Sequence, residues 1–274
     1  MRTIVITGAS DGIGAAAAEQ LAEPQTRLVI VGRSPAKTQA VAERTGAEYH
    51  IADFTRLDEV RALAETLLAR HDRIEVLANN AGGLFSGPEL TADGFEKTFQ
   101  VNHLAPFLLT HLLTDRLLSS RATVVATSSI ASLIYSRLDL ADIQTMHPYR
   151  PNRAYGNAKL ANILFTKGLH ARFGQQGLSA VAFHPGAVAT NFASETSSYL
   201  RQVYHGLLQR FLVSPEQGGA NLVHFINGRP GIDWESGGFY NDRRRPGRTS
   251  SRAGDPEVVR RHWQISADLL GLGR

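Results

Sequence analysis

The sequence predicts an α/β protein with a doubly wound parallel sheet in a single domain. Short β-branched runs alternate along the chain with longer stretches that are rich in alanine and leucine. Most of the short runs are continuously apolar, which is typical of strands buried on both faces of a parallel sheet. The 274 residues suffice for one large α/β domain and not clearly for two.

Six strands are expected, at residues 3–7, 27–31, 48–51, 74–78, 123–128 and 179–183. Helices are expected at residues 13–22, 35–45, 57–69, 92–118, 153–173 and 215–226. Two segments interrupt this alternation. Residues 133–151 form a long insertion between a strand and a helix, and residues 192–213 form an extra helical segment. Insertions beyond the carboxyl ends of strands usually border a ligand crevice.

The composition excludes several classes of function. The chain has no cysteine, so disulfides, thiolate zinc sites and cysteine nucleophiles are excluded, and a reducing compartment suits it. The net charge is +4, and several arginines lie between residues 243 and 252. That segment is rich in Gly, Pro and Ser, and no aromatic residue alternates with its arginines. A solvated loop is therefore expected there rather than a nucleic-acid surface.

A soluble cytoplasmic protein is expected. Met1 leads directly into an apolar strand, with no signal peptide before it, and no run reaches the roughly 18 apolar residues of a membrane span. His103, His111, His170 and His184 show no metal-ligand spacing, so no metal is expected.

The stretch TGASDGIG, residues 7–14, fits two known patterns. The nucleophile elbow of serine hydrolases, G-x-S-x-G, needs an oxyanion loop from an earlier strand, and none precedes this first strand. A phosphate-binding turn needs small residues so that backbone N–H groups can approach the ligand, and Gly8, Gly12 and Gly14 supply them. The spacing differs from G-x-G-x-x-G, so an ordinary glycine-rich turn remains the alternative. Ser10 is then a turn residue, not a nucleophile.

Tyr155 and Lys159 lie four residues apart in an expected helix, on one face. The ammonium group of Lys159 is expected to stabilise the phenolate of Tyr155, so that the tyrosine can exchange a proton near neutral pH. A surface Tyr–Lys pair is the alternative. Ser128 and Ser129 end the fifth strand, where doubly wound sheets place their sites.

These motifs together resemble the short-chain dehydrogenase/reductase family. The resemblance rests on TGASDGIG, on Asp53 after the third strand, on Asn79-Asn80-Ala81-Gly82 after the fourth, and on Tyr155-Gly-Asn-Ala-Lys159. It covers about residues 3–190. VNHLAPFLLT (101–110) and AYGNAKLANILFTKGL (154–169) resemble the retinol dehydrogenase and protochlorophyllide reductase branch. A Rossmann fold is implied.

The resemblance implies a role for each site residue. Tyr155 would be the general acid/base, Lys159 would hold the nicotinamide ribose, and Ser129, rather than Ser128, would fix the substrate. Asn102 would help to hold a water that relays protons, with a purely structural asparagine as the alternative. The cofactor site would be formed by Gly8, Ser10, Asp11, Gly12, Ile13, Gly14, Arg33, Asp53, Phe54, Asn80, Ala81, Gly82, Tyr155, Lys159, Pro185, Gly186, Val188 and Thr190.

The end of the second strand favours NADP(H) over NAD(H). It carries Arg33 where an NAD enzyme usually has an acid, and a basic residue there accommodates a 2′-phosphate. Lys37 offers a second contact. Asp11 argues against NADP(H), because many NADP-dependent relatives have a basic residue just before the second glycine. The alternatives are a solvent-exposed arginine for Arg33 and a helix cap for Asp53.

Within residues 1–274 we expect a cofactor-binding and catalytic core (1–190), a substrate lid (191–213), and C-terminal helices with the last strand (214–274). Residues 200–212 have one apolar helical face, which suits a lid over an apolar substrate, although core packing or a partner or membrane-surface contact would also explain it.

The function expected from this resemblance is an NADP(H)-dependent carbonyl reductase or alcohol dehydrogenase for a small molecule. A catalytically idle NADP(H) sensor on the same fold is the main alternative. A sugar epimerase is a third, but it usually needs a larger C-terminal domain than the segment after Thr190 offers. Many relatives assemble through their long helices, so the resemblance leaves a homo-oligomer open.

Overall fold

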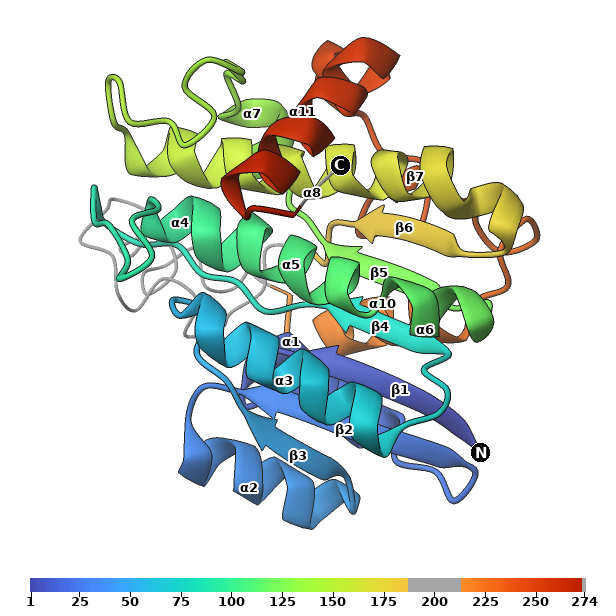
Figure 1. Cartoon of the computed structure of the whole chain (residues 1–274). Coiled ribbons are helices and arrows are strands. Elements are labelled where there is room, and N and C mark those ends of the chain that lie inside the picture. Colours follow the sequence, from blue (N-terminus) through green and yellow to red (C-terminus); the bar gives the residue numbers. More distant parts are fainter. Residues whose placement is uncertain (187–212, 273–274) are drawn as a thin grey trace.

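The computed structural model describes residues 1–186 and 213–272, and its centre is a parallel sheet (Figure 1). The sheet has seven strands in the order β3-β2-β1-β4-β5-β6-β7, and every neighbouring pair is parallel. This order confirms the doubly wound α/β fold. The strands are β1 (Arg2–Thr7), β2 (Thr26–Gly32), β3 (Glu48–Ile51), β4 (Val76–Asn79), β5 (Thr123–Thr127), β6 (Ser179–Phe183) and β7 (Gly238–Tyr240).

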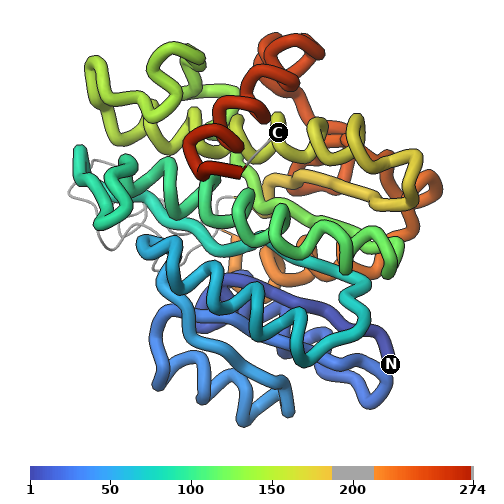
Figure 2. Tube along the Cα trace, viewed as in Figure 1, coloured from blue at the N-terminus to red at the C-terminus, as the bar shows by residue number. Residues whose placement is uncertain are grey.

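Helices cover both faces of the sheet. On one face lie α1 (Gly12–Gln20), α2 (Pro35–Thr45) and α10 (Pro215–Asn227). On the other face lie α3 (Leu57–Arg70), α5 (Ala105–Leu112) and α8 (Pro151–Phe173). The C-terminal helix α11 (Pro256–Leu269) packs beside α8, although about 80 residues separate them in sequence (Figure 2). The short helices are α4 (Lys97–Phe99), η1 (Gln100–Leu104), α6 (Thr114–Ser119), α7 (Ala131–Ile134), η2 (Gly174–Gln176) and η5 (Ser251–Gly254).

The strand order reverses direction at β1. From β1 the chain proceeds to β2 and β3 on one side of the sheet, then crosses to β4 and β5 on the other. The loops that leave β1 and β4 therefore diverge, and a crevice opens between them at the carboxyl edge of the sheet. This crevice is where a doubly wound sheet places its ligand.

The single helix expected over residues 92–118 is divided. Gly94, with φ +82°, forms a turn, and α4 begins only at Lys97. Glu96 caps α4: its buried carboxylate accepts the N–H groups of Thr98 (3.0 Å) and Phe99 (2.7 Å). The next turn, η1, is a π-helix, and a further break follows at Leu113. Apolar periodicity does not reveal these breaks, because both sides of each break face the same core.

The remaining expected elements either match the structure or differ from it by no more than two residues at an end. Strand β4 starts at Val76 and not at Ile74. Ile74 is fully buried, but its N–H donates to the Ser120 hydroxyl (3.0 Å) instead of entering the strand ladder. Except for Val213, the expected extra helix at residues 192–213 lies outside the described residues.

The insertion after β5 begins in α7 and ends where α8 starts. It is fastened to the neighbouring loop, because the Tyr149 hydroxyl donates to the Glu96 carboxylate (3.2 Å). It is also fastened to α8, because Asn157 accepts the Arg137 N–H (2.7 Å) and donates to the Thr145 hydroxyl (2.8 Å). Burial raises the pKa of Glu96, and burial with the nearby Glu96 charge raises that of Tyr149 to about 12.

Helices α1 and α10 approach each other closely at Gly219. A Cβ atom there would lie 2.8 Å from the Cβ of Ala16 and 2.9 Å from the backbone nitrogen of Ala17. Real Cβ atoms do not approach other atoms so closely, so a side chain at this position would push the helices apart. The small residues of both helices therefore fix the position of α10 against the sheet.

We predict that Gly219→Val lowers the free energy of unfolding by about 1–3 kcal/mol, because it overpacks this contact. Gly254→Val is the control, since a Cβ at that exposed glycine would meet no atom within 4 Å. Urea unfolding of both variants tests the prediction. Equal midpoints for the two would show that α1 and α10 are not tightly packed.

Candidate active site

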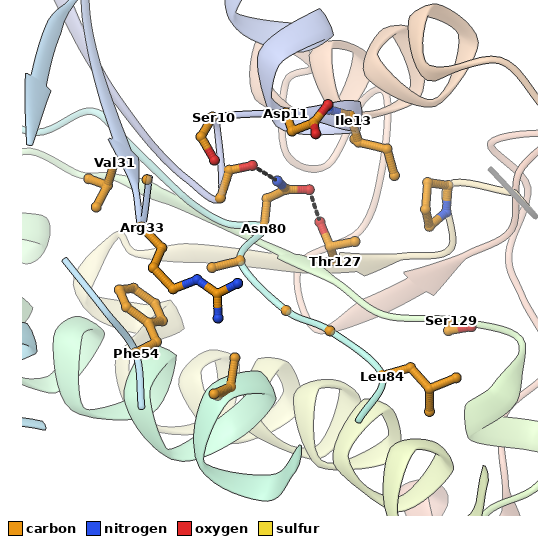
Figure 3. Close-up of a pocket in the computed structure, with 18 of the residues that line it drawn as sticks. Ser10, Asp11, Ile13, Val31, Arg33, Phe54, Asn80, Leu84, Thr127 and Ser129 are labelled. Atoms are coloured by element: carbon orange, nitrogen blue, oxygen red, sulfur yellow. Dashed lines mark hydrogen bonds between the residues drawn. The ribbon is translucent and has the colours of Figure 1, made fainter. Parts of the chain in front are cut away.

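A cavity of about 490 Å³ opens at the carboxyl ends of the strands (Figure 3). Arg33 and Phe54 lie at one end of it, and Ser129 and Leu84 at the other. Most residues expected at the site line this cavity: Gly8, Ser10, Asp11, Gly12, Ile13, Arg33, Asp53, Phe54, Asn80, Ala81, Gly82, Ser129, Tyr155, Lys159, Pro185 and Gly186. Val188 and Thr190 lie outside the described residues.

The glycine turn leaves space that side chains would otherwise fill. Gly8 and Gly12 have φ values of +66° and +57°, which favour glycine. A Cβ at Gly14 would lie 2.3 Å from the carbonyl oxygen of Gly8. The turn therefore packs closely beneath the amino end of α1 and presents that end, with its positive dipole, to the cavity. These features fit the phosphates of a dinucleotide.

Asn80 holds this turn to two strands. Its Nδ2 donates to the carbonyl oxygens of Thr7 (3.0 Å) and Gly8 (3.2 Å), and its Oδ1 accepts the Thr127 hydroxyl (3.1 Å), as the dashed lines in Figure 3 show in part. One amide thus joins the ends of β1, β4 and β5. The hydrogen bonds from Asn80 hold the carbonyl groups of the glycine turn in place.

At the Arg33 end, charges lie around the cavity rim. Asp11 caps α1 by accepting the Gly12 N–H (2.8 Å), and it pairs with Lys37 at 2.9 Å. Both side chains of this pair are about half exposed. The ammonium group of Lys37 therefore offsets the negative charge of Asp11, which would otherwise repel a 2′-phosphate. Asp53 does not cap α3: it accepts the Thr55 N–H (2.9 Å), and the carboxylate of Asp93 accepts the N–H of Leu57, the first residue of α3.

The two serines after β5 face different ways. The Ser128 hydroxyl is buried and donates to the Lys159 carbonyl (2.7 Å). Both serines line the cavity, but Ser129 is the more exposed of the two, and its hydroxyl accepts the Ala131 N–H (3.2 Å). The geometry favours Ser129 over Ser128 for contact with a ligand.

Helix α8 carries Tyr155 and Lys159 on its cavity side. Lys159 is only 2% exposed; its Nζ donates to the Thr127 carbonyl (3.1 Å) and lies 5.6 Å from the centre of the Tyr155 ring. Burial lowers the pKa of Lys159 to about 7. The ammonium group is therefore poised between its charged and neutral forms near neutral pH.

Asn102 lies behind the cavity and not in its lining. Its side chain donates to the carbonyl oxygens of Gly83 and Thr98 (both 2.8 Å) and accepts the Gly83 N–H (3.1 Å). A Cβ at Gly82 would lie 2.5 Å from its Oδ1 and 3.0 Å from the Lys159 Nζ. Only a glycine at this point lets Asn102 and the lysine approach from both sides.

Comparisons with known proteins identify the family. The family model for short chain dehydrogenases matches residues 2–200. The chain belongs to this family. It is a short-chain dehydrogenase/reductase, an NAD(P)-dependent oxidoreductase acting on CH–OH or C=O groups.

This short-chain dehydrogenase has similar relatives over nearly its full length. A proposed daunorubicin C-13 ketoreductase of Streptomyces sp. (strain C5) is 39% identical over 98% of this chain and 93% of its own. Mouse retinol dehydrogenase 12 is 37% identical over 99% of this chain and 87% of its own. A crystal structure of an uncharacterized Mycobacterium paratuberculosis protein superposes with a TM-score of 0.79 at 30% identity, over 99% of this chain and 94% of that one.

Two further features complete the description. Among residues 1–186 and 213–272, no group of three His, Asp or Glu side chains could hold a metal ion. Within the same part of the chain, no helix has the length and apolar character that a membrane crossing needs.

Some lining residues were not among those expected from the sequence. Leu84 and Phe85 follow the Asn79-Asn80-Ala81-Gly82 motif and line the cavity, and Leu84 packs with Ala131 and Tyr155. An apolar pair directly after a strand-end motif could have suggested them. Thr127, which supports both Asn80 and Lys159, could have been suspected from its place just before the two serines.

We predict that Lys159→Met stabilises the dinucleotide-free protein, and more at about pH 7 than at about pH 9. The folded-state pKa of Lys159 (about 7) lies below its ordinary value, so unfolding takes up a proton, and the resulting destabilisation grows as the pH falls from about 10.5 to 7. The stability advantage of the variant over the wild type should therefore be larger by about 2 kcal/mol at about pH 7 than at about pH 9.

Urea unfolding at the two pH values measures this difference. Lys167→Met, on the same helix but outside the cavity, reports on the general effect of removing a lysine from α8. A pH-independent difference between K159M and the wild type would contradict the lowered pKa.

Proposed function

We propose that the protein is an NADP(H)-dependent carbonyl reductase or alcohol dehydrogenase for an apolar small molecule. One observation carries this proposal: Ser129 and Leu84 lie at one end of a cavity whose other end is bordered by Arg33. Tyr155 packs against Leu84, and the Lys159 Nζ lies 5.6 Å from the centre of the Tyr155 ring, so both belong to the Ser129 end. Proton-transfer groups at one end and a cation at the other suit a ligand that is long, phosphorylated and reactive at one end only.

NADP(H), when bound, supplies or accepts a hydride at its nicotinamide ring. The chain supplies the remaining chemistry. The hydroxyl groups of Ser129 and Tyr155 bind the substrate oxygen, and Tyr155 donates a proton to it during reduction or removes one during oxidation. Lys159, held by the Thr127 carbonyl, stabilises the phenolate that Tyr155 becomes after donation.

Asn102 supports this proton transfer from behind. It fixes the backbone at Gly83, and Gly82 leaves open the narrow space between Asn102 and Lys159. We assign Asn102 to the proton path that recharges Lys159, as the family resemblance suggests. The apolar contact of Tyr155 with Leu84 and Ala131 excludes water from one side of the reacting group.

The apolar character of the substrate is supported by Leu84 and Phe85 in the cavity wall. It is also supported by the names of two relatives, which refer to daunorubicin and to retinol. The NADP(H) preference is supported by Arg33, whose guanidinium reaches over the cavity beside Phe54 (Figure 3), and by the pairing of Asp11 with Lys37.

We predict that Tyr155→Phe retains NADPH binding and loses about 10²–10⁴-fold in turnover, because the proton donor is removed. Steady-state rates over a panel of carbonyls and alcohols, with NADPH binding measured in parallel, check this. Tyr49→Phe, on the exposed edge strand β3, is the matched control. Retained turnover in Y155F would refute the role of Tyr155. Wild-type NADPH binding without turnover on any compound would instead indicate a dinucleotide sensor.

We predict that Arg33→Gln raises the KM for NADPH by about 10–100-fold and leaves the KM for NADH nearly unchanged, because only NADPH has a 2′-phosphate for the guanidinium. The wild type should prefer NADPH. Arg27→Gln, at the exposed amino end of the same strand, is the control. A wild type that uses NADH equally well or better would overturn the cofactor assignment.

A further inference from the structure

The carboxyl ends of β6 and β7 are bridged by one side chain. A backbone hydrogen bond, from the His184 N–H to the Tyr240 carbonyl (2.8 Å), lies at the end of their ladder. Beyond it, the Nδ2 of Asn221 donates to the carbonyl oxygens of Pro185 and Asp242, both at 3.2 Å. The amide of Asn221, from α10, thus continues the connection where the two strands end.

Asn221 is held in this orientation. It is 2% exposed, and its Oδ1 accepts the Nε–H of Arg244 at 3.2 Å. Arg244 has a φ of +59°, and its Nη2 donates to the carbonyl oxygen of Ala220 (3.3 Å). A flipped amide would set its NH₂ against the arginine and its oxygen against two carbonyls, so only one orientation satisfies all three partners.

The helix that carries Asn221 is fixed to the glycine turn. Two residues earlier, Gly219 packs against the backbone of α1, whose amino end forms the phosphate side of the cavity. A rigid helix thus places Asn221 at a set distance from that side. Asn221 can therefore fix the segment after β6 relative to the amino end of α1.

The segment that Asn221 holds belongs to the reactive end of the cavity. Pro185 and Gly186 line the cavity just after β6, whose last residue, Phe183, accepts the N–H of Ser128, the neighbour of Ser129 (2.8 Å). Gly186 has a φ of +102°, and a Cβ there would lie 2.8 Å from Val213. The backbone of this turn therefore adopts a conformation that requires glycine at position 186, and Asn221 holds the turn through the Pro185 carbonyl.

We propose that Asn221 is a positioning residue that holds the Pro185–Gly186 turn against the nicotinamide end of the bound dinucleotide. The inference rests on the proposed function, because that function places the nicotinamide beside Tyr155. Asn221 touches neither dinucleotide nor substrate. It acts through the backbone of Pro185, and Arg244 holds its amide in the required orientation.

Asn221→Asp tests this role with almost no change of volume. The aspartate keeps the acceptor for Arg244 but sets an oxygen against the two carbonyl groups, so the turn should be released. NADPH affinity, measured by fluorescence titration, should fall about tenfold. The affinity for 2′-phospho-ADP-ribose, which lacks the nicotinamide, should stay unchanged in calorimetry. Asn227→Asp, an exposed change on the same helix, should affect neither ligand.

A second pair of variants tests the same role through Arg244. Arg244→Met removes the donor to Asn221 and should weaken NADPH binding in the same selective way. Arg244→Gln restores an N–H at the same distance along the side chain and should recover most of the affinity. This pair keeps the test decisive if N221D does not fold.

The outcomes are distinct. Selective loss of NADPH affinity in N221D or R244M, with recovery in R244Q, supports the inference. An equal loss for both ligands, no loss, or failure of both N221D and R244M to fold overturns it and leaves the proposed function standing. A folded wild type that binds 2′-phospho-ADP-ribose but no NADPH, or neither, overturns the proposed function and the inference with it.

Discussion

The close contact between the first turn and the end of β4 is the constraint on which the site depends. A Cβ at Gly8 would lie 2.6 Å from the Cα of Ala81, so the two backbones touch where side chains would normally separate them. From this contact a continuous series of hydrogen bonds runs through Asn80 and Thr127 to Lys159. The glycine turn after β1 and helix α8 are therefore joined by one network of hydrogen bonds.

Much of this arrangement could be read from the sequence because it depends on local patterns. Continuous apolar runs predicted the parallel strands, since a strand covered on both faces has no polar side. The site motifs lie directly after strands, and parallel strands bring their carboxyl ends to one edge. For that reason Gly8, Asn80 and Ser129, far apart in sequence, were expected at one place, and the structure gathers them around one cavity. Tyr155 lies in a helix, and only the resemblance to the family placed it at the same site.

The parts that could not be predicted depend on partners distant in sequence. Nothing near Glu96 indicates that its buried carboxylate caps a helix and binds Tyr149. A lone asparagine in α10 gives no sign that it serves the ends of two strands. The pairing of Asp11 with Lys37 could not be predicted, because the ion pair joins a turn to a different helix. Such contacts become visible only once the fold has placed both partners.

The insertion after β5 is held by a few side-chain contacts and leaves many of its other residues exposed. Its buried contacts, from Tyr149 to Glu96 and from Asn157 to Thr145, fix its course against the neighbouring loop and α8. Other residues of the insertion, such as Asp139 and His147, are exposed and take no part in these contacts. Substitutions at such exposed positions therefore leave intact the contacts that hold the insertion against α8.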